Sequence, residues 1–195
     1  MDQPRRLVLA STSKYRKALL ERLGLSFELG TPAVDERRLA EETPPATALR
    51  LAILKARALE ERFGDALIVG SDQVAAVGSE RLDKPGTHEH ALVQLRRLSG
   101  QAADFHTAVA LFDSRGKTMQ SRVVPCRVTF RTLDEARIEA YLRREQPYDC
   151  AGSAKAEGLG IALIARIETD DPTSLIGLPL IALTEMLERA GLPVV

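Results

Sequence analysis

The sequence predicts an α/β protein with a mixed sheet and flanking helices. Short apolar runs suited to buried strands alternate along the chain with segments whose apolar residues recur at helical spacing. In the second half, two extended segments flank a short polar turn, which indicates an antiparallel hairpin. Helices interleaved with isolated strands and a hairpin favour a mixed sheet, with the functional site where loops leave the strand ends. We expect one domain over residues 1–195.

The first half of the chain predicts two successive strand and helix pairs. A Ser-Thr-Ser segment can cap the first helix, and Pro44-Pro45 opens the second. The expected elements are a strand over residues 6–10, a helix ending near residue 24, a strand over residues 26–29 and a helix over residues 46–63. Lys55 then lies close to the middle of the second helix, and the loop before that helix carries Asp35 and Glu36.

The rest of the chain begins with an apolar strand over residues 66–69. Ser71 and Asp72 follow Gly70 in a sequence typical of turns, so we expect a break before an extended segment over residues 73–77. The remaining expected elements are a helix over residues 87–98, hairpin strands over 105–112 and 119–130, a helix over 133–145, an extended segment over 158–168 and a helix over 179–190.

Charge and hydropathy argue against two classes of partner. Lys plus Arg and Asp plus Glu both number 27, so the chain has no field of one sign to hold a nucleic-acid backbone or an anionic membrane. No apolar run approaches the length that spans a bilayer, and the first apolar stretch is too short for the core of a signal peptide. We therefore expect a cytoplasmic protein that binds neither nucleic acid nor a membrane.

Ser11, Ser13 and Arg16 stand at the predicted start of the first helix. Free backbone N–H groups and the positive end of the helix dipole favour an anion there, and Arg16 adds a fork of donors. The combination would bind a phosphate group. The alternative is that the serines only cap the helix and Arg16 is solvated, and neither a Walker motif nor a dinucleotide fingerprint is present.

Three carboxylates stand out by position, namely Asp35 and Glu36 in a loop after a strand and Asp72 directly beyond an apolar strand. Such carboxylates can hold Mg²⁺ or Mn²⁺ while substrate phosphates supply further oxygens. Lys55 and Lys84 would add positive charge to stabilise phosphoryl oxygens and a departing pyrophosphate. The alternatives are a turn-forming aspartate, a solvated acidic loop and a solvated helix lysine.

Eight short segments, taken in order, resemble the Maf family from end to end of the chain. They are Leu9-Ala10-Ser11-x-Ser13-x-x-Arg16, Val34-Asp35-Glu36, Lys55-Ala56, Gly70-Ser71-Asp72, Lys84-Pro85, Leu98-Ser99-Gly100, His106-Thr107-Ala108-Val109 and Ile176-Gly177-Leu178-Pro179-Leu180. The resemblance implies a nucleoside triphosphate pyrophosphatase that uses a divalent metal cation and releases a monophosphate and pyrophosphate. It also implies an elongated, two-lobed Maf/ITPase-like unit with a central cleft, often paired as a homodimer.

The resemblance assigns roles to these residues. Asp72, with a metal ion held partly by Glu36, would activate water for attack at the α-phosphorus, either as a general base or as a metal ligand. Arg16, Lys55 and Lys84 would stabilise the leaving pyrophosphate. A catalytically silent nucleotide-sensing or cell-division regulator is the rival from another class, because a fold does not guarantee turnover.

The subfamily is a separate inference. Gln73 and the segment Cys150-Ala151-Gly152-Ser153-x-Lys155-x-Glu157-Gly158 look like the branch that acts on 7-methyl-GTP, rather than the branch for dTTP and UTP. N7-methylation makes guanine cationic, so Tyr15 could supply an aromatic face and Glu157 a carboxylate, while Gln73 could bond the base edge. Related proteins often carry tryptophan where this chain has Tyr15, and tyrosine is a weaker cation–π partner.

Overall fold

The structure is a computed structural model that describes residues 5–78 and 80–195. The chain divides into two compact units. The first contains the residues up to Gln73 together with Thr107–Val124 and Asp171–Val195, and the second contains Val74–His106 and Pro125–Asp170. The described residues form five α-helices and a seven-stranded mixed sheet, which confirms the predicted α/β class. No helix in the described ranges has the length and apolar character needed to cross a bilayer.

The strands follow the order β2-β1-β3-β5-β6-β7, and β4 also pairs with β3. Parallel pairing joins β1 to β2 and to β3, whereas β3 with β4 and β6 with β7 are antiparallel. The bounds are β1 Arg6–Ala10, β2 Glu28–Gly30, β3 Ala66–Val77, β4 Glu80–Leu82, β5 Ala102–Asp113, β6 Thr118–Phe130 and β7 Ile164–Thr169. The predicted hairpin is confirmed, since β5 and β6 are adjacent in the sheet and joined by a short turn.

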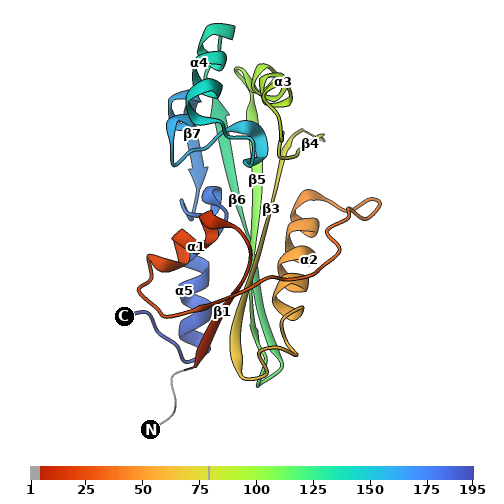
Figure 1. The fold of residues 1–195 in the computed structure, drawn as a ribbon, viewed down its shortest axis with the longest axis vertical. Helices are drawn as coiled ribbons and strands as arrows, with labels where there is room; N and C mark the ends of the chain where they lie inside the picture. Colours follow the sequence, from red (N-terminus) through yellow and green to blue (C-terminus); the bar gives the residue numbers. More distant parts are fainter. Residues whose placement is uncertain (1–4, 79) are drawn as a thin grey trace. The chain divides into compact units, whose positions relative to one another are not determined.

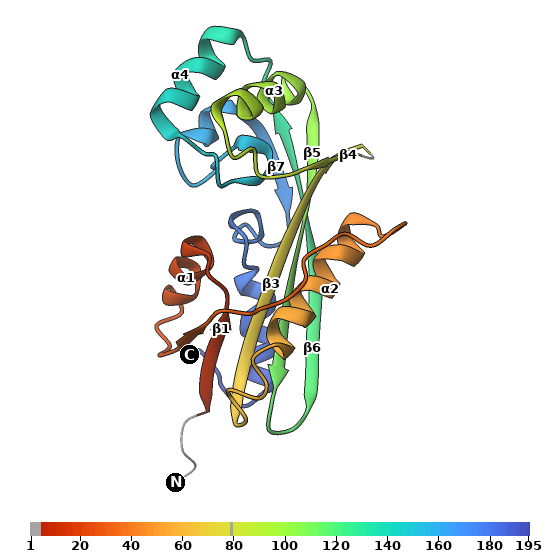
Figure 2. The same cartoon turned by 45° about the vertical axis from the view of Figure 1, so that its right-hand side comes forward.

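In the first unit, helices cover both faces of the sheet (Figure 1 and Figure 2). Helices α1 (Lys14–Glu21) and α5 (Leu180–Arg189) lie on one face, where their apolar side chains share a core with Leu67 and Val69 of β3. Helix α2 (Pro44–Arg57) lies on the other face. Burial of these apolar surfaces, at about 25 cal/mol per Å², holds the three layers together.

Gly70 allows α2 to lie very close to β3. A Cβ atom at this position would stand 2.1 Å from the Ala52 carbonyl oxygen and 2.7 Å from the Ala56 nitrogen, both on α2. Any side chain would therefore push the helix away from the strand. Gly70 faces α2. Since side chains alternate along a strand, the even-numbered residues of β3 near it point toward α2 and the odd-numbered residues point to the opposite face.

The predicted break at Ser71 and Asp72 is wrong, because β3 runs without interruption from Ala66 to Val77. The Gly-Ser-Asp sequence favours a turn locally, but tertiary hydrogen bonds favour the strand here. The Ser71 hydroxyl lies 2.7 Å from the carbonyl oxygen of Ala108 in β5. Asp72 is thus a strand residue rather than a turn residue, and its side chain must point to one face of the sheet.

Other boundaries also differ from the prediction. Helix α2 ends at Arg57 and not at residue 63. Leu59 and Phe63 are buried, but they lie in the segment of turns that follows the helix, so their apolar character reflects burial and not a longer helix. The segment predicted as extended from residue 158 begins with a 3₁₀ helix, Leu159–Leu163, and becomes strand β7 only afterwards. Strand β2 lies slightly later than predicted, and the short strand β4 was not predicted.

The second unit contains α3 (His88–Leu98) and α4 (Glu135–Glu145), which contact each other. Both helices begin where the sequence predicts, within two residues, because both have side-chain caps. The Thr87 hydroxyl accepts from the His90 N–H at 3.3 Å, and the Asp134 carboxylate accepts from the Arg137 N–H at 2.7 Å.

Helix α5 receives its cap from a residue distant in the chain. Pro179 at its start makes no side-chain cap. The buried carboxylate of Asp171 instead accepts from the N–H groups of Ile181 at 2.7 Å and Ala182 at 3.4 Å, and from the Thr173 hydroxyl at 2.6 Å. Asp171 therefore ties residues 171–178 to the start of α5.

We expect Asp171→Ala to lower the free energy of unfolding by about 2 kcal/mol, because it removes a buried carboxylate and leaves the N–H groups of Ile181 and Ala182 without their acceptor. Urea unfolding followed by circular dichroism measures this change. The exposed neighbour is the matched control, and Asp170→Ala should unfold close to the wild type. Equal midpoints for the two variants would contradict the capping role.

Candidate active site

The parallel strands β2, β1 and β3 end at one edge of the sheet. Strand β1 pairs with β3 as far as Ala10 opposite Gly70, and with β2 as far as Gly30. Parallel strands place their carboxyl ends together, so the segments that follow lie near one another. These segments are the start of α1, the irregular loop of residues 31–43 and the continuation of β3. They carry the predicted site residues of the first unit, apart from the one on α2.

Lys55 of α2 joins two of the predicted carboxylates. Its Nζ lies 2.7 Å from Oδ1 of Asp72 and 3.1 Å from Oε2 of Glu36. The side chains of Lys55 and Asp72 are only 7% and 11% exposed, whereas that of Glu36 is 58% exposed. The structure thus brings together three predicted residues from three different elements, as a buried charge pair with a second carboxylate on its solvent side.

Alternation along β3 explains why Asp72 reaches Lys55. Gly70 and Asp72 share the face that α2 covers, while Ser71 and Gln73 share the opposite face. On that opposite face, the Ser71 hydroxyl lies 2.9 Å from the Gly177 carbonyl oxygen. Two neighbouring residues of one motif therefore serve opposite sides of the sheet, beyond the point where β1 has ended.

The amide group of Gln73 is held by the protein. Its Nε2 lies 2.9 Å from the Thr107 hydroxyl and 3.0 Å from each of the carbonyl oxygens of Ser174 and Leu175. Two carbonyl acceptors require the nitrogen, not the oxygen, on this side of the amide. The Oε1 atom has no hydrogen bond among the described residues, and as a carbonyl oxygen it can only accept one.

Arg16 connects α1 to the same region. Its Nε donates to the Gly177 carbonyl oxygen at 2.8 Å. Burial lowers the pKa of the Arg16 guanidinium, and the negative charges of Asp72 and Glu36 act in the opposite direction. An arginine remains protonated under either influence. Arg16 is thus a fixed positive charge within electrostatic reach of the two carboxylates that Lys55 joins.

Ser11 and Ser13 act as local acceptors at the start of α1. The Ser13 hydroxyl accepts from the Arg16 N–H at 3.4 Å, and the Ser11 hydroxyl accepts from the Ser13 N–H at 3.1 Å. These contacts are the capping arrangement that the sequence allowed as an alternative to phosphate binding. Tyr15 follows them on the first turn, half-buried, with the ammonium group of Lys14 4.9 Å from its ring centroid.

Asp72 and Glu36 are the carboxylates of this cluster that could serve as ligands of a divalent cation. Their oxygens approach one ammonium group, so two carboxylates from separate elements already surround one positive charge. Mg²⁺ is held in proteins by one or two carboxylates, with substrate phosphates and water as further ligands. Across residues 5–78 and 80–195, no group of three or more His, Cys, Asp or Glu side chains could hold a metal. A cation held by these two carboxylates would therefore need further ligands, such as substrate phosphates and water.

The loop that carries Glu36 is fastened to α2 by Arg50. The Arg50 guanidinium donates to both carboxylate oxygens of Glu42, at 2.7 and 2.8 Å, and to the Arg37 carbonyl oxygen at 3.1 Å. Asp35, the other predicted loop carboxylate, pairs with the Arg37 side chain at 2.6 Å. Asp35 is therefore a loop acid with its own partner, and Arg50 sets the position of the loop beside Glu36.

The Glu42 contacts predict a pH-dependent stability. Hydrogen bonds from Arg50 lower the pKa of Glu42 from 4.5 to about 2. A carboxylate with a depressed pKa stabilises the fold above its unfolded pKa, and that contribution is lost as the pH falls from about 4.5 to about 2. At pH 7 we expect Glu42→Gln to lose about 1–2 kcal/mol, allowing for solvent screening at the edge of the pair.

Denaturant unfolding of the wild type and Glu42→Gln across this pH range measures the difference. The gap between the two proteins should narrow steadily as the pH falls. A gap that stays constant with pH would contradict the proposed charge pair. The exposed Glu41 provides the control, since Glu41→Gln should be about as stable as the wild type at pH 7.

Lys84 and Glu157 belong to the second unit. Lys84 is exposed on the loop between β4 and α3, and among the described residues its ammonium group has no hydrogen bond or ion pair. Glu157 is also exposed, and its charge helps to raise the pKa of Lys155, after the stronger effect of the Glu145 carboxylate. The structure therefore assigns these two residues to a different unit from the Lys55 cluster.

Several contacts of this region leave little signal in the sequence. The Gly177 carbonyl oxygen receives both Arg16 and Ser71, but a backbone acceptor leaves no side-chain signal in a sequence. Arg50 is one of many helix cations, and nothing in its neighbours predicts a partner in the loop before the helix. Asp171 had a detectable signal, since an aspartate two residues before a threonine commonly forms a local turn.

Comparison with known proteins identifies the family of this chain. The model of the Maf-like protein family matches residues 6–190. A protein of Thiobacillus denitrificans named 7-methyl-GTP pyrophosphatase is 58% identical over 188 residues, which cover 96% of this chain and 94% of that protein. A protein with the same name from Cupriavidus pinatubonensis is 55% identical, and the match covers 96% of this chain and 94% of that protein. Another from Paraburkholderia xenovorans is 54% identical, and the match covers 99% of this chain and 96% of that protein. The matches span nearly the whole sequence, and the chain belongs to the Maf family.

Proposed function

We propose that this chain is a nucleoside triphosphate pyrophosphatase that hydrolyses 7-methyl-GTP to the monophosphate and pyrophosphate, a housecleaning activity against modified nucleotides. The observation that carries the proposal is the buried pair of Lys55 and Asp72, with Glu36 and Arg16 beside it, where three parallel strands end. The relatives named for this reaction match nearly the whole chain and support the choice of substrate.

Asp72 is the proposed water-activating group. As the water oxygen forms its bond to the α-phosphorus, the carboxylate accepts the proton, and the bond from the α-phosphorus to the bridging oxygen breaks to release pyrophosphate. Lys55, at 2.7 Å from Oδ1, keeps the carboxylate in one orientation. The same carboxylate in the same place also suits a metal ligand, which is the alternative role.

Positive charge for the phosphates comes from several groups in this proposal. Arg16 and Lys55 lie close to Asp72 and would stabilise negative charge as it moves toward the leaving group. Ser11 and Ser13 are proposed to bind phosphate at the start of α1, where the positive end of the helix dipole favours an anion. The family resemblance supports Lys84 as a further cation for the departing pyrophosphate.

Asp72 and Glu36 are the proposed ligands of a divalent cation, Mg²⁺ or Mn²⁺. When bound, such an ion neutralises part of the phosphate charge. The two carboxylates support this proposal because both lie within 3.1 Å of the Lys55 ammonium, which brings oxygen atoms from two separate elements close together.

Tyr15, Gln73 and Glu157 are the proposed base-selecting residues. The positively charged 7-methylguanine ring suits an aromatic face and a carboxylate, which Tyr15 and Glu157 offer. Gln73 offers its Oε1 atom as an acceptor, because its nitrogen is already bonded to the protein. It would therefore receive a hydrogen bond from an N–H donor on the guanine edge.

Incubation of the purified chain with Mg²⁺ or Mn²⁺ and a nucleotide panel tests the proposal. We expect pyrophosphate release with the highest kcat/KM for 7-methyl-GTP among 7-methyl-GTP, GTP, dTTP and UTP, and no release without metal. Faster turnover of dTTP or UTP would show that the protein belongs to the other branch of the family, although the type of reaction would be the one proposed. Nucleotide binding without pyrophosphate release would favour a non-catalytic regulator.

We further propose that residues 1–195 act as one Maf-like domain, that the protein works in the cytoplasm, and that it pairs as a homodimer, as the family resemblance implies. Analytical ultracentrifugation of the purified chain tests the last point. A single species with the mass of one chain at micromolar concentration would overturn the homodimer.

A further inference from the structure

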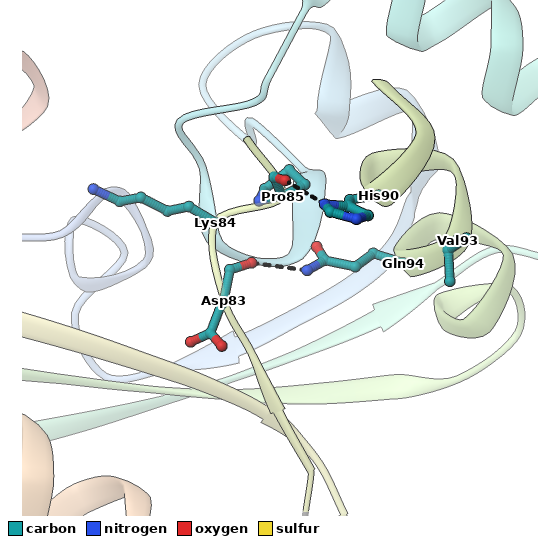
Figure 3. Close-up of a pocket in the computed structure, with 6 residues that line it drawn as sticks. All are labelled: Asp83, Lys84, Pro85, His90, Val93 and Gln94. Carbon is teal, nitrogen blue, oxygen red and sulfur yellow. Dashed lines mark hydrogen bonds between the residues drawn. The ribbon is translucent and has the colours of Figure 1, made fainter. Parts of the chain in front are cut away.

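Lys84 lies on a loop that α3 holds through a side-chain hydrogen bond. The Gln94 Nε2 of α3 donates to the Asp83 carbonyl oxygen at 2.8 Å (Figure 3). In the same view, the Lys84 side chain extends away from His90 and Gln94. Since the ammonium group has no partner among the described residues, the direction of this side chain depends on how the backbone at residues 83–86 is held.

Gln94 is itself held from its other end. The Ser153 hydroxyl donates to Gln94 Oε1 at 2.7 Å, so both polar atoms of the amide are engaged. The nitrogen must face the Asp83 carbonyl oxygen, and the oxygen must face the hydroxyl, which leaves one orientation for the amide. The two hydrogen bonds from Ser153 to Gln94 and from Gln94 to Asp83 therefore link the start of the Lys84 loop to residues 150–158. These residues form the segment that resembles the 7-methyl-GTP branch.

Ser153 makes this contact from an uncommon backbone conformation. Its φ is +56°, in the left-handed region that non-glycine residues rarely occupy, and the residue is completely buried. The preceding residue, Gly152, has a φ of +71°. A glycine at position 153 would relieve the strain but would remove the hydroxyl that engages Gln94.

Resting on the proposed function, we infer that Gln94 and Ser153 are positioning residues that hold the Lys84 loop in place for pyrophosphate departure. Two further contacts restrain the same loop, since His90 Nδ1 lies 3.1 Å from the Pro85 carbonyl oxygen and the Gly86 N–H donates to the Tyr148 carbonyl oxygen at 3.0 Å. Gln94 is the member that connects the loop to the subfamily segment.

A double-mutant cycle in the full chain tests this inference. Gln94→Met keeps the length of the side chain and removes both hydrogen bonds, and we expect kcat for 7-methyl-GTP to fall about tenfold with KM little changed. In a Lys84→Met background, the same change should lower kcat less than about twofold, because Gln94 acts through Lys84. An equal loss in both backgrounds, or no loss in either, would overturn the inference.

Ser153→Ala removes only the hydroxyl and serves as the second variant if Gln94→Met does not fold; we expect a kcat loss of about threefold or more, again dependent on Lys84. Gln101→Met, at an exposed glutamine of the same unit, is the matched control and should leave kcat unchanged. A fall in kcat for this control comparable to that of Gln94→Met would overturn the specific role of Gln94.

Amide hydrogen exchange supplies a readout that needs no substrate. In Gln94→Met and Ser153→Ala, the Gly86 amide, which donates to the Tyr148 carbonyl oxygen, should exchange about threefold to tenfold faster than in the wild type, while the amides of the α3 interior keep their protection. Unchanged exchange overturns the inference. If the wild type releases no pyrophosphate from any nucleotide, the proposed function fails, and the exchange rates alone then decide whether these residues hold the loop.

Discussion

Asp72→Asn is expected to lower kcat for pyrophosphate release by about a thousandfold, the range found when a positioned general base is removed. The substitution keeps the shape of the side chain and removes the negative charge that lies 2.7 Å from the Lys55 ammonium. An amide can neither accept the proton of an attacking water nor hold a divalent cation as a carboxylate does. Stopped or continuous assays of pyrophosphate with 7-methyl-GTP measure the change.

Two further measurements complete this experiment. Asp65→Asn, at an exposed carboxylate shortly before β3, is the matched control and should retain full activity. A metal titration of Asp72→Asn then separates the two roles: a lost ligand raises the metal concentration needed for half-maximal rate, whereas a lost base lowers the rate at saturating metal. Turnover near the wild-type rate would remove Asp72 from the mechanism.

Lys55→Met is expected to lower the free energy of unfolding by about 3 kcal/mol, because it leaves the Asp72 carboxylate in a buried place without its charged partner. The two side chains are 7% and 11% exposed, so solvent cannot fully replace the ammonium group. Glu36, on the solvent side, loses a partner as well but remains hydrated. Denaturant unfolding at pH 7 measures the loss.

The size of this effect depends on burial, and two comparisons test that cause. Lys55→Met with Asp72→Leu also removes the buried carboxylate that Lys55→Met leaves without its ammonium partner, so much of the lost stability should return. Lys117→Met breaks an exposed pair, in which Lys117 Nζ lies 2.6 Å from Glu60 Oε1, and should change stability by less than about 1 kcal/mol. Similar losses in Lys55→Met and Lys117→Met would contradict the buried pair.

Secondary structure was predictable where local chemistry decides it. Thr87 caps α3 and Asp134 caps α4 through hydrogen bonds to residues three positions later, so those helix starts depend on neighbours in the chain. The break expected at Ser71 illustrates the opposite case. There a turn-forming sequence continues as a strand, because hydrogen bonds to Ala108 and Gly177 favour the extended chain.

Candidate site residues were also predictable as a set, but their partners were not. The order of short motifs pointed to Asp72, Lys55, Glu36 and Arg16, and the structure brings these four together in the first unit. Nothing local links Arg50 to its acceptors in the loop before α2, Glu42 and the Arg37 carbonyl oxygen, which lie 8 and 13 residues away. Such contacts follow from how the loop folds back onto α2.

The sequence by itself therefore determined the α/β class, most helix starts, the family and the residues that could carry the chemistry, because caps, periodicity and motif order are properties of neighbouring positions. Only the tertiary structure decided that Asp72 lies within a strand, that it points to α2 while Gln73 points to the opposite face, and that Lys55 is its buried partner. These outcomes depend on strand pairing and on the alternation of side chains across a sheet, which bring residues distant in the chain into contact.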